Sequence, residues 1–115
     1  MFVYMIECSD GSLYTGIASD VVKRLRAHYH RLPECAKYTR SRQMVGIAAF
    51  WEVEDKITAC RLEYRIKKLS RSEKNKLIDG SLEILSLLPG AERNAAVRRA
   101  ETEEIAETLE KIRQL

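Results

Sequence analysis

Residues 3–28 read VYMIECSDGSLYTGIASDVVKRLRAH, and this stretch decides the fold. Strand-forming residues lie on both sides of the turn signal SDGS at 9–12, which predicts a β-hairpin. After the second strand, Ser19 or Asp20 can cap a helix whose apolar residues recur at helical spacing to about residue 31. The predicted order is therefore strand, turn, strand, helix.

The register of the hairpin depends on the length of its turn. A three-residue loop at 9–11, with its final glycine in the left-handed conformation, pairs Tyr4 with Gly16 and Tyr14 with Ile6. Both tyrosine side chains then point to the same face, and Gly16 leaves room over the Tyr4 ring. A two-residue turn would put the tyrosines on opposite faces, because side chains alternate along a strand. We favour the three-residue loop.

Four further segments follow the first helix. Residues 33–43 are polar and basic and predict a loop, whereas VGIAAFWEV at 45–53 is apolar enough for a strand covered on both sides. A helix opening at Asp55 or Thr58 comes next. The segment SRSE at 70–73 has the form of a capping box and predicts another short helix.

Residues 81–115 predict one short and one longer amphipathic helix, separated by Pro89 and Gly90. The fold class we predict is α/β, of the α+β kind: a three-stranded antiparallel sheet flanked by helices. Residues 1–80 would form the domain, and residues 81–115 a helical C-terminal extension packed on or beside it.

The composition is typical of a soluble globular protein, with 45% hydrophobic and 32% charged residues in 115. A chain of this length supports one hydrophobic core. No apolar run approaches the roughly 18 residues of a membrane span, and Met1 leads straight into a strand pattern without a basic targeting segment. We expect no membrane partner and a cytoplasmic location.

Cys8, Cys35 and Cys60 are isolated thiols in an odd number, without a Cys-x-x-Cys pair. They indicate neither a disulfide framework nor a zinc ligand set. We expect reduced, structural cysteines.

The positive charge is unevenly distributed. Residues 1–80 contain 15 Lys and Arg against 10 Asp and Glu, a net +5, whereas residues 81–115 contain 5 against 7, a net −2. The basic excess therefore belongs to the predicted domain, which is typical of a surface that meets phosphates.

Two tripeptides connect this chain with a known family. Val3-Tyr4-Met5 and Tyr14-Thr15-Gly16 resemble the paired motifs of the GIY-YIG nucleases, although the first reads Val-Tyr-Met where the family name has Gly-Ile-Tyr. The chain is most similar to the small single-domain bacterial branch. It departs from that branch at 32–35, where relatives tend to have glycines. The likeness covers about two thirds of the chain and continues through residues 20–28, 36–40 and 63–70.

The resemblance implies the catalytic set Tyr4, Tyr14, Arg24, His28 and Glu63. Tyr4 matches the general base that acts on the attacking water, and Tyr14 the residue that orients the water or the phosphate. Glu63 matches the glutamate that holds Mg²⁺ or Mn²⁺. A lone carboxylate suffices for that role, since magnesium is commonly bound through one or two carboxylates plus water and phosphate oxygens.

Arg24 and His28 lie one helical turn apart. Arg24 can grip a phosphate oxygen and stay charged, and His28 can donate to the phosphate or protonate the leaving oxygen. A nearby cation would also make the proton of a tyrosine easier to lose.

Each candidate also has an ordinary structural interpretation. Glu63 can pair with Lys67 on a helix surface, either tyrosine can be a strand aromatic, and Arg24 with His28 can form a solvated helix face. For Glu63 or either tyrosine taken singly, the structural interpretation is the better one, and only the combined motif favours a nuclease.

Further basic residues would contact the nucleic-acid backbone with little sequence preference. Asn75 is the only nearby match for an asparagine that the family often has late in the domain. The expected backbone contacts are Lys37, Thr39, Arg40, Arg42 and Lys67.

The sequence thus predicts a divalent-metal-dependent endonuclease acting on DNA that is branched, flapped or single-stranded. The alternative is a nucleic-acid-binding module of the same fold that cleaves poorly without a partner protein. A third hypothesis makes the acidic C-terminal helix, within residues 90–115, a docking surface for a partner or a second copy.

Overall fold

A four-stranded antiparallel sheet forms the centre of the molecule, in the strand order β2-β1-β3-β4. The structure is a computed structural model that describes residues 1–114. The three predicted strands are present, and the short fourth strand was not predicted. The strands are β1 (Phe2–Cys8), β2 (Leu13–Ala18), β3 (Met44–Val53) and β4 (Val97–Arg99).

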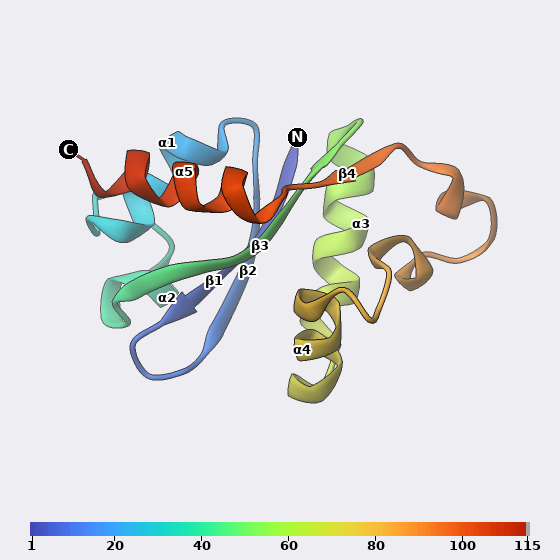
Figure 1. Cartoon of the computed structure of the whole chain (residues 1–115), viewed down its shortest axis with the longest axis horizontal. Coiled ribbons are helices and arrows are strands. Elements are labelled where there is room, and N and C mark those ends of the chain that lie inside the picture. Colours follow the sequence, from blue (N-terminus) through green and yellow to red (C-terminus); the bar gives the residue numbers. More distant parts are fainter. Residues whose placement is uncertain (115) are drawn as a thin grey trace.

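Helices cover both faces of this sheet, as Figure 1 shows. α1 and α5 lie on one side, and α3 and α4 lie on the other. No helix of the described residues is long and apolar enough to cross a membrane. The helices are α1 (Val21–Tyr29), α2 (Lys37–Ser41), α3 (Lys56–Lys67), α4 (Arg71–Asp79) and α5 (Thr102–Arg113), with 3-10 turns η1 (Ile84–Leu87) and η2 (Gly90–Asn94).

The central strand β1 is buried on both faces, so each face has its own core. Val3 and Met5 pack under α3, α4 and η1, whereas Tyr4 and Ile6 pack with α1 and α5. This division follows from the alternation of side chains along a strand. Tyr4 therefore lies on the α1 side.

The hairpin register is the one predicted for the three-residue loop. Tyr4 pairs with Gly16 and Ile6 pairs with Tyr14, so that both tyrosines share a face. Gly11 has φ 83°, the left-handed conformation that the turn needs. A Cβ atom at Gly16 would collide with the Tyr4 hydroxyl, so only glycine lets the Tyr4 ring lie across β2.

The helix starts follow local signals. The Asp20 side chain accepts from the backbone N–H of Lys23 (3.1 Å) and caps α1, and Ser70 with Glu73 forms the predicted capping box of α4. The expectation of a plain loop over 33–43 is wrong, because this segment contains α2.

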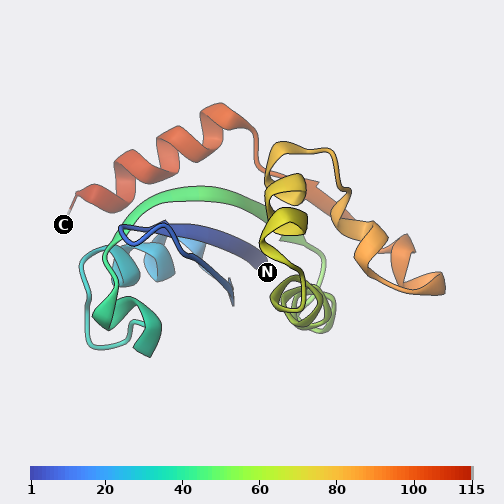
Figure 2. The same cartoon turned by 90° about the horizontal axis from the view of Figure 1, so that it is seen from below.

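The expectation of a long final helix from about residue 91 is wrong as well. Val97–Arg99 pairs with Trp51–Val53 and covers the free edge of β3, and α5 begins only at Thr102. Figure 2 shows the chain leaving α4, turning away from the sheet and returning along β4 to α5, which lies over β3. Leu115, the last residue of the predicted extension, lies outside the described residues.

Candidate active site

Three aromatic rings from three different elements meet beside β2. The ring centroids of Tyr4 and Tyr14 lie 6.4 Å apart, and the His28 ring lies 5.6 Å from Tyr4 and 5.5 Å from Tyr14. The hairpin register brings the two tyrosines to the same face, and α1 packs against that face through Val21 and Leu25.

A buried chain of hydrogen bonds runs from Tyr4 of β1 through His28 of α1 to Thr39 of α2. The Tyr4 hydroxyl lies 2.7 Å from His28 Nε2, and His28 Nδ1 lies 2.8 Å from Thr39 Oγ1. The Thr39 hydroxyl donates in turn to the carbonyl oxygen of Ala36 at 3.0 Å. His28 and Thr39 have no exposed surface, and Tyr4 is 1% exposed.

Burial sets the protonation states of this chain. It raises the pKa of Tyr4 to about 12, an effect that the nearby Arg24 opposes and that Tyr14 and Glu63 reinforce. Burial, together with the positive charge of Arg24, lowers the pKa of His28 to about 4. At neutral pH the site therefore holds a phenol and a neutral imidazole. Arg24 does lower the pKa of Tyr4, as expected of a nearby cation, but burial raises it by more.

His28 lies behind Tyr4 and not at the surface of the site. Both of its ring nitrogens have partners within the protein. The expectation that His28 touches a phosphate or the leaving oxygen is therefore wrong for this structure, because the ring has no exposed surface. Its position suits a residue that exchanges a proton with Tyr4.

Arg24 is partly exposed and lies near both Tyr4 and His28, since its charge affects the pKa of each. It donates one hydrogen bond from Nη1 to the carbonyl oxygen of Glu34. Arg24 also lines a hollow of about 550 Å³ together with Asp20, Lys23 and Glu34. Its remaining N–H groups can meet an anion there.

Glu63 approaches the same cluster from α3, which packs along β2 from the other face of the sheet. Its charge raises the pKa of Tyr4, and its carboxylate Oε2 lies 3.4 Å from Lys67 Nζ. That ammonium group lies 5.8 Å from the ring centroid of Tyr14. The five residues expected to be catalytic are thus brought together.

The residues around Glu63 fit one type of metal site only. Among residues 1–114, no group of three or more His, Cys, Asp and Glu side chains could hold a metal ion. A zinc-type ligand set is therefore absent from this part of the chain. A lone, partly exposed carboxylate does fit magnesium or manganese bound mainly by water and phosphate oxygens.

Tyr38 is a residue of the site that sequence reasoning missed. Its ring stacks on Tyr14 with a centroid distance of 5.2 Å and an interplanar angle of 29°. The Arg42 guanidinium lies over the Tyr38 ring, 4.1 Å from its centroid, and pairs with Asp10 at 3.0 Å. The four-residue spacing of Tyr38 and Arg42 is a local signal for their contact, but nothing local indicates the stack on Tyr14.

The expected backbone contacts fall into three groups. Lys37, Arg40 and Lys67 are exposed, although Arg40 also donates to the Pro33 carbonyl oxygen at 3.2 Å. Arg42 is engaged by Tyr38 and Asp10. Thr39 is fully buried, so the expectation that it contacts nucleic acid is wrong.

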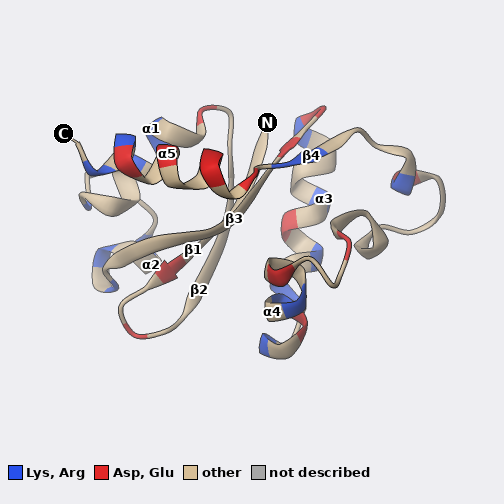
Figure 3. Ribbon diagram, viewed as in Figure 1, with Lys and Arg blue, Asp and Glu red and all other residues tan. Residues whose placement is uncertain are grey.

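Basic residues gather on α3 and α4, as Figure 3 shows. Residues 61–76 contain seven Lys and Arg against Glu63 and Glu73. Tyr64, the residue after Glu63, is 58% exposed, and the Lys68 ammonium lies 5.0 Å from its ring centroid. An exposed aromatic among cations is typical of surfaces that bind unpaired nucleotides.

Asn75 lies apart from the buried cluster and is exposed. Its side-chain oxygen accepts from Arg71 Nε at 3.2 Å. Arg71 Nη1 also donates to the carbonyl oxygen of Gly11 at 2.7 Å. This arrangement ties the start of α4 to the hairpin turn.

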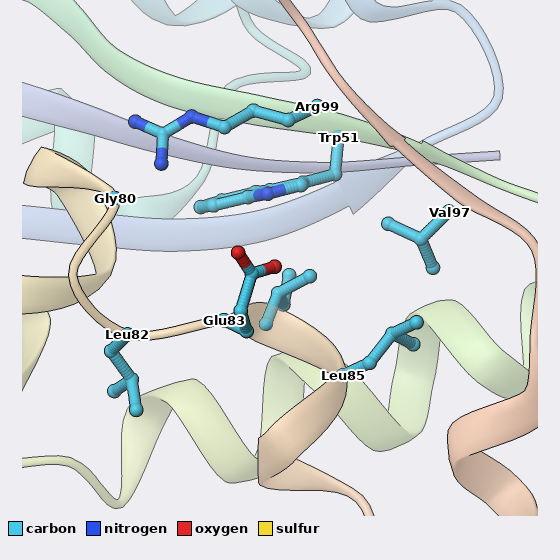
Figure 4. Close-up of a pocket in the computed structure, with 8 residues that line it drawn as sticks. Trp51, Gly80, Leu82, Glu83, Leu85, Val97 and Arg99 are labelled. Atoms are coloured by element: carbon cyan, nitrogen blue, oxygen red, sulfur yellow. The ribbon is translucent and has the colours of Figure 1, made fainter.

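A second hollow, of about 580 Å³, lies at the opposite edge of the sheet, between β3, β4 and the chain after α4. Figure 4 shows Arg99 running along the Trp51 indole, with the Glu83 carboxylate pointing toward the indole from the other side. The Arg99 guanidinium lies 5.6 Å from the Trp51 ring and donates to the carbonyl oxygens of Leu77 (2.9 Å) and Ile78.

Comparison with known proteins gives consistent matches. The family model described as "GIY-YIG catalytic domain" matches residues 1–77. UPF0213 protein BH0048 of Halalkalibacterium halodurans is 43% identical over 77 residues, which cover 67% of this chain and 80% of that protein. UPF0213 protein VNG_2274C of Halobacterium salinarum is 47% identical over 75 residues, which cover 65% of this chain and 95% of that protein. The solution NMR structure of UPF0213 protein BH0048 from Bacillus halodurans matches with a TM-score of 0.43 and 40% identity, over 68% of this chain and 81% of that one.

Proposed function

The chain belongs to the GIY-YIG nuclease family, and from that membership we propose that it is a divalent-metal-dependent endonuclease that hydrolyses phosphodiester bonds in DNA. The observation that carries the proposal is the meeting of Tyr4, Tyr14 and His28 beside Arg24 and Glu63. In this proposal residues 1–80 are the nuclease-like domain and residues 81–115 are its C-terminal extension.

Glu63 would hold Mg²⁺ or Mn²⁺ through its carboxylate, with water and substrate phosphate as the other ligands. When bound, such an ion acidifies water and offsets charge on the phosphoryl oxygens. Lys67, now paired with Glu63, would turn to the substrate backbone.

Tyr4 acts as the base through His28. As the water oxygen bonds to phosphorus and the bond to the leaving oxygen breaks, a water proton passes to the Tyr4 oxygen. The phenol proton passes at the same time to His28 Nε2, 2.7 Å away, so a free phenolate is not required. The leaving oxygen takes a proton from solvent.

Arg24 binds the phosphate in this mechanism, and Tyr14 orients it or the attacking water. Arg24 contacts the phosphoryl oxygens with the N–H groups that the Glu34 carbonyl does not use, and it remains charged throughout. Tyr14, held by the stacked Tyr38 ring, orients the water or the phosphate.

The substrate we propose is branched, flapped or single-stranded DNA, read with low sequence specificity. The basic residues of α3 and α4, with Lys37 and Arg40, would contact the phosphates. Exposed Tyr64 beside Glu63 supports a preference for unpaired bases next to the cleaved bond, because every base can stack on an aromatic ring.

A nucleic-acid-binding module with little cleavage activity of its own is the second candidate. The observation in its favour is that the Glu63 carboxylate is already paired with Lys67 at 3.4 Å. Salt-sensitive DNA binding without a metal-dependent product would support this candidate.

The C-terminal segment could also bind a partner or a second copy. α5 packs its buried residues Thr108 and Ile112 on the domain, so a partner would meet the outer, acidic face of the helix. Weaker self-association after deletion of residues 90–115 would support this role, provided that the shortened protein stays folded.

The experiment is a cleavage panel of plasmid, branched and single-stranded DNA, with RNA counterparts, in Mg²⁺ or Mn²⁺. Glu63→Gln should lower metal-dependent cleavage at least about 100-fold, because it removes the ligand charge. Glu83→Gln, the same change at the opposite edge of the sheet, should leave cleavage unchanged. Equal cleavage by Glu63→Gln and the unaltered protein would contradict the proposal.

A further inference from the structure

The Thr39 side chain stands at the far end of the buried hydrogen-bond chain from Tyr4. Its hydroxyl lies 2.8 Å from His28 Nδ1 and 3.0 Å from the carbonyl oxygen of Ala36. The Thr39 backbone N–H donates to the same carbonyl at 3.0 Å. Thr39 is therefore held near the start of α2 with its hydroxyl beside Nδ1 of the imidazole.

Counting protons and acceptors shows which group donates in each of these hydrogen bonds. A carbonyl oxygen can only accept, so a Thr39 hydroxyl that donates to Ala36 must accept from His28 Nδ1–H. A neutral imidazole protonated on Nδ1 has a lone pair on Nε2, which accepts the Tyr4 phenol proton. Every proton then has an acceptor.

The opposite direction leaves one proton without a partner. If Thr39 donated to Nδ1, His28 would carry its proton on Nε2 and donate to the Tyr4 oxygen. The Tyr4 hydroxyl proton would then need another acceptor. Arg24, whose side chain also bonds to the Tyr4 hydroxyl, can only donate, so within residues 1–114 His28 Nε2 is the one acceptor found for this proton. A buried hydroxyl proton without an acceptor is destabilising.

We propose that Thr39 is a positioning residue, which holds His28 in the Nδ1–H tautomer and so keeps Nε2 free to take the phenol proton of Tyr4. The tautomer follows from the geometry alone, and its catalytic consequence rests on the proposed nuclease function. The hydroxyl in the AKYTR segment thus acts on the chemistry through His28, without touching nucleic acid.

His30 provides an internal reference for a test by NMR. Its Nε2 lies 2.8 Å from the Ile112 carbonyl oxygen, which can only accept, so neutral His30 carries its proton on Nε2. The two histidines of the chain should therefore show opposite tautomers in a long-range ¹H–¹⁵N correlation spectrum, recorded at mildly alkaline pH where imidazole is neutral. A His28 proton on Nε2 in the unaltered protein would overturn the proposal.

Thr39→Val and Thr39→Ser form a matched pair of variants. Valine has the shape of threonine without the hydroxyl, so His28 should move toward the Nε2–H tautomer while His30 is unchanged. Serine keeps the hydroxyl and should keep the Nδ1–H tautomer. An unchanged His28 tautomer in folded Thr39→Val would overturn the proposal. Loss of the Nδ1–H tautomer in folded Thr39→Ser, which keeps the hydroxyl, would overturn it as well.

Cleavage kinetics give the catalytic readout. Thr39→Val should lower kcat about 10- to 100-fold with little change in KM, within the range of acid–base catalysis, and Thr39→Ser should recover most of kcat. An unchanged kcat in Thr39→Val would overturn the catalytic part. If the unaltered protein cleaves nothing, the proposed function fails, whereas the tautomer spectrum still decides the role of Thr39.

Discussion

The two hollows at opposite edges of the sheet are nearly equal in size and opposite in chemistry. The hollow beside Arg24 measures about 550 Å³, and the one beside Arg99 about 580 Å³. Each has an arginine close to an aromatic side chain, Tyr4 near Arg24 and Trp51 near Arg99. Volume therefore does not distinguish the site from a packing feature in this molecule.

Hydrogen-bond partners do distinguish them. Arg99 donates to the last carbonyl groups of α4, which stabilises a helix end and fastens β4 to it. Near Arg24, Tyr4, His28 and Thr39 bond to one another through side chains and have two shifted pKa values among them. Buried titratable side chains with shifted pKa values are typical of functional sites, whereas hydrogen bonds to backbone carbonyl groups stabilise the fold.

The largest difference between the two edges of the sheet should appear in the rate of DNA cleavage when the Tyr4 hydroxyl is removed. Tyr4→Phe should slow DNA cleavage at least about 100-fold, because the base that acts on the attacking water is lost while the ring still fills the core. Single-turnover cleavage of the preferred substrate measures the effect. Tyr29→Phe, which removes a phenol outside the hydrogen-bond chain, is the control. If Tyr4→Phe cleaves DNA as fast as the control, the side chains near Arg24 have no larger role in cleavage than those near Arg99.

Acid should destabilise the Arg24 edge selectively. The His28 pKa falls from about 6.5 in the unfolded chain to about 4 in the folded protein, so the unfolded chain binds more protons between these values. The stability contributed by neutral His28 is full above pH 6.5 and decreases as the pH falls toward 4, by about 3 kcal/mol in total.

Urea unfolding across this pH range measures the effect. His28→Gln should flatten the dependence of the unfolding free energy on pH, whereas a change at Arg99 should lower the whole curve without altering its slope. Parallel curves for His28→Gln and the unaltered protein would show that His28 does not cause the acid sensitivity.

Arg99→Leu should affect stability and leave chemistry intact. The loss of two charged hydrogen bonds to the end of α4 should lower the free energy of unfolding by about 2 kcal/mol. The neighbouring Arg98→Leu removes an exposed arginine that pairs with Glu104 and Glu52, and it should have a smaller effect. Cleavage by both folded variants should match that of the unaltered protein. A large decrease of kcat in Arg99→Leu would show that the hollow beside Arg99 takes part in cleavage.

The smallest effect concerns the exposed ring next to Glu63. Tyr64→Ala should weaken binding of single-stranded DNA about fivefold or more, the loss of one base stacked on an aromatic ring, and should weaken duplex binding less. Fluorescence anisotropy with both ligands measures the difference. Ile57→Ala, at another exposed apolar residue of α3, is the control. Equal losses for single strands and duplexes would rule out base stacking at Tyr64.

Local sequence signals predicted the hairpin, its register, the cap of α1 and the capping box of α4. In each case the deciding residues are neighbours along the chain, such as Ser70 with Glu73 or the glycine at the end of the turn. The family was also evident from short motifs, and the five side chains predicted to be catalytic do lie near one another. The short motifs therefore predicted which side chains lie near one another, but not how deeply they are buried.

The sequence by itself thus determined the order of the elements, the face shared by Tyr4 and Tyr14, and the family. Only the tertiary structure decided that β4 pairs with β3, that Tyr38 stacks on Tyr14, and that the Thr39 hydroxyl bonds to His28. The physical reason is that strand pairing and burial depend on contacts between distant parts of the chain. Burial in particular is a property of the assembled core, and here it outweighs a neighbouring cation in setting the pKa of Tyr4.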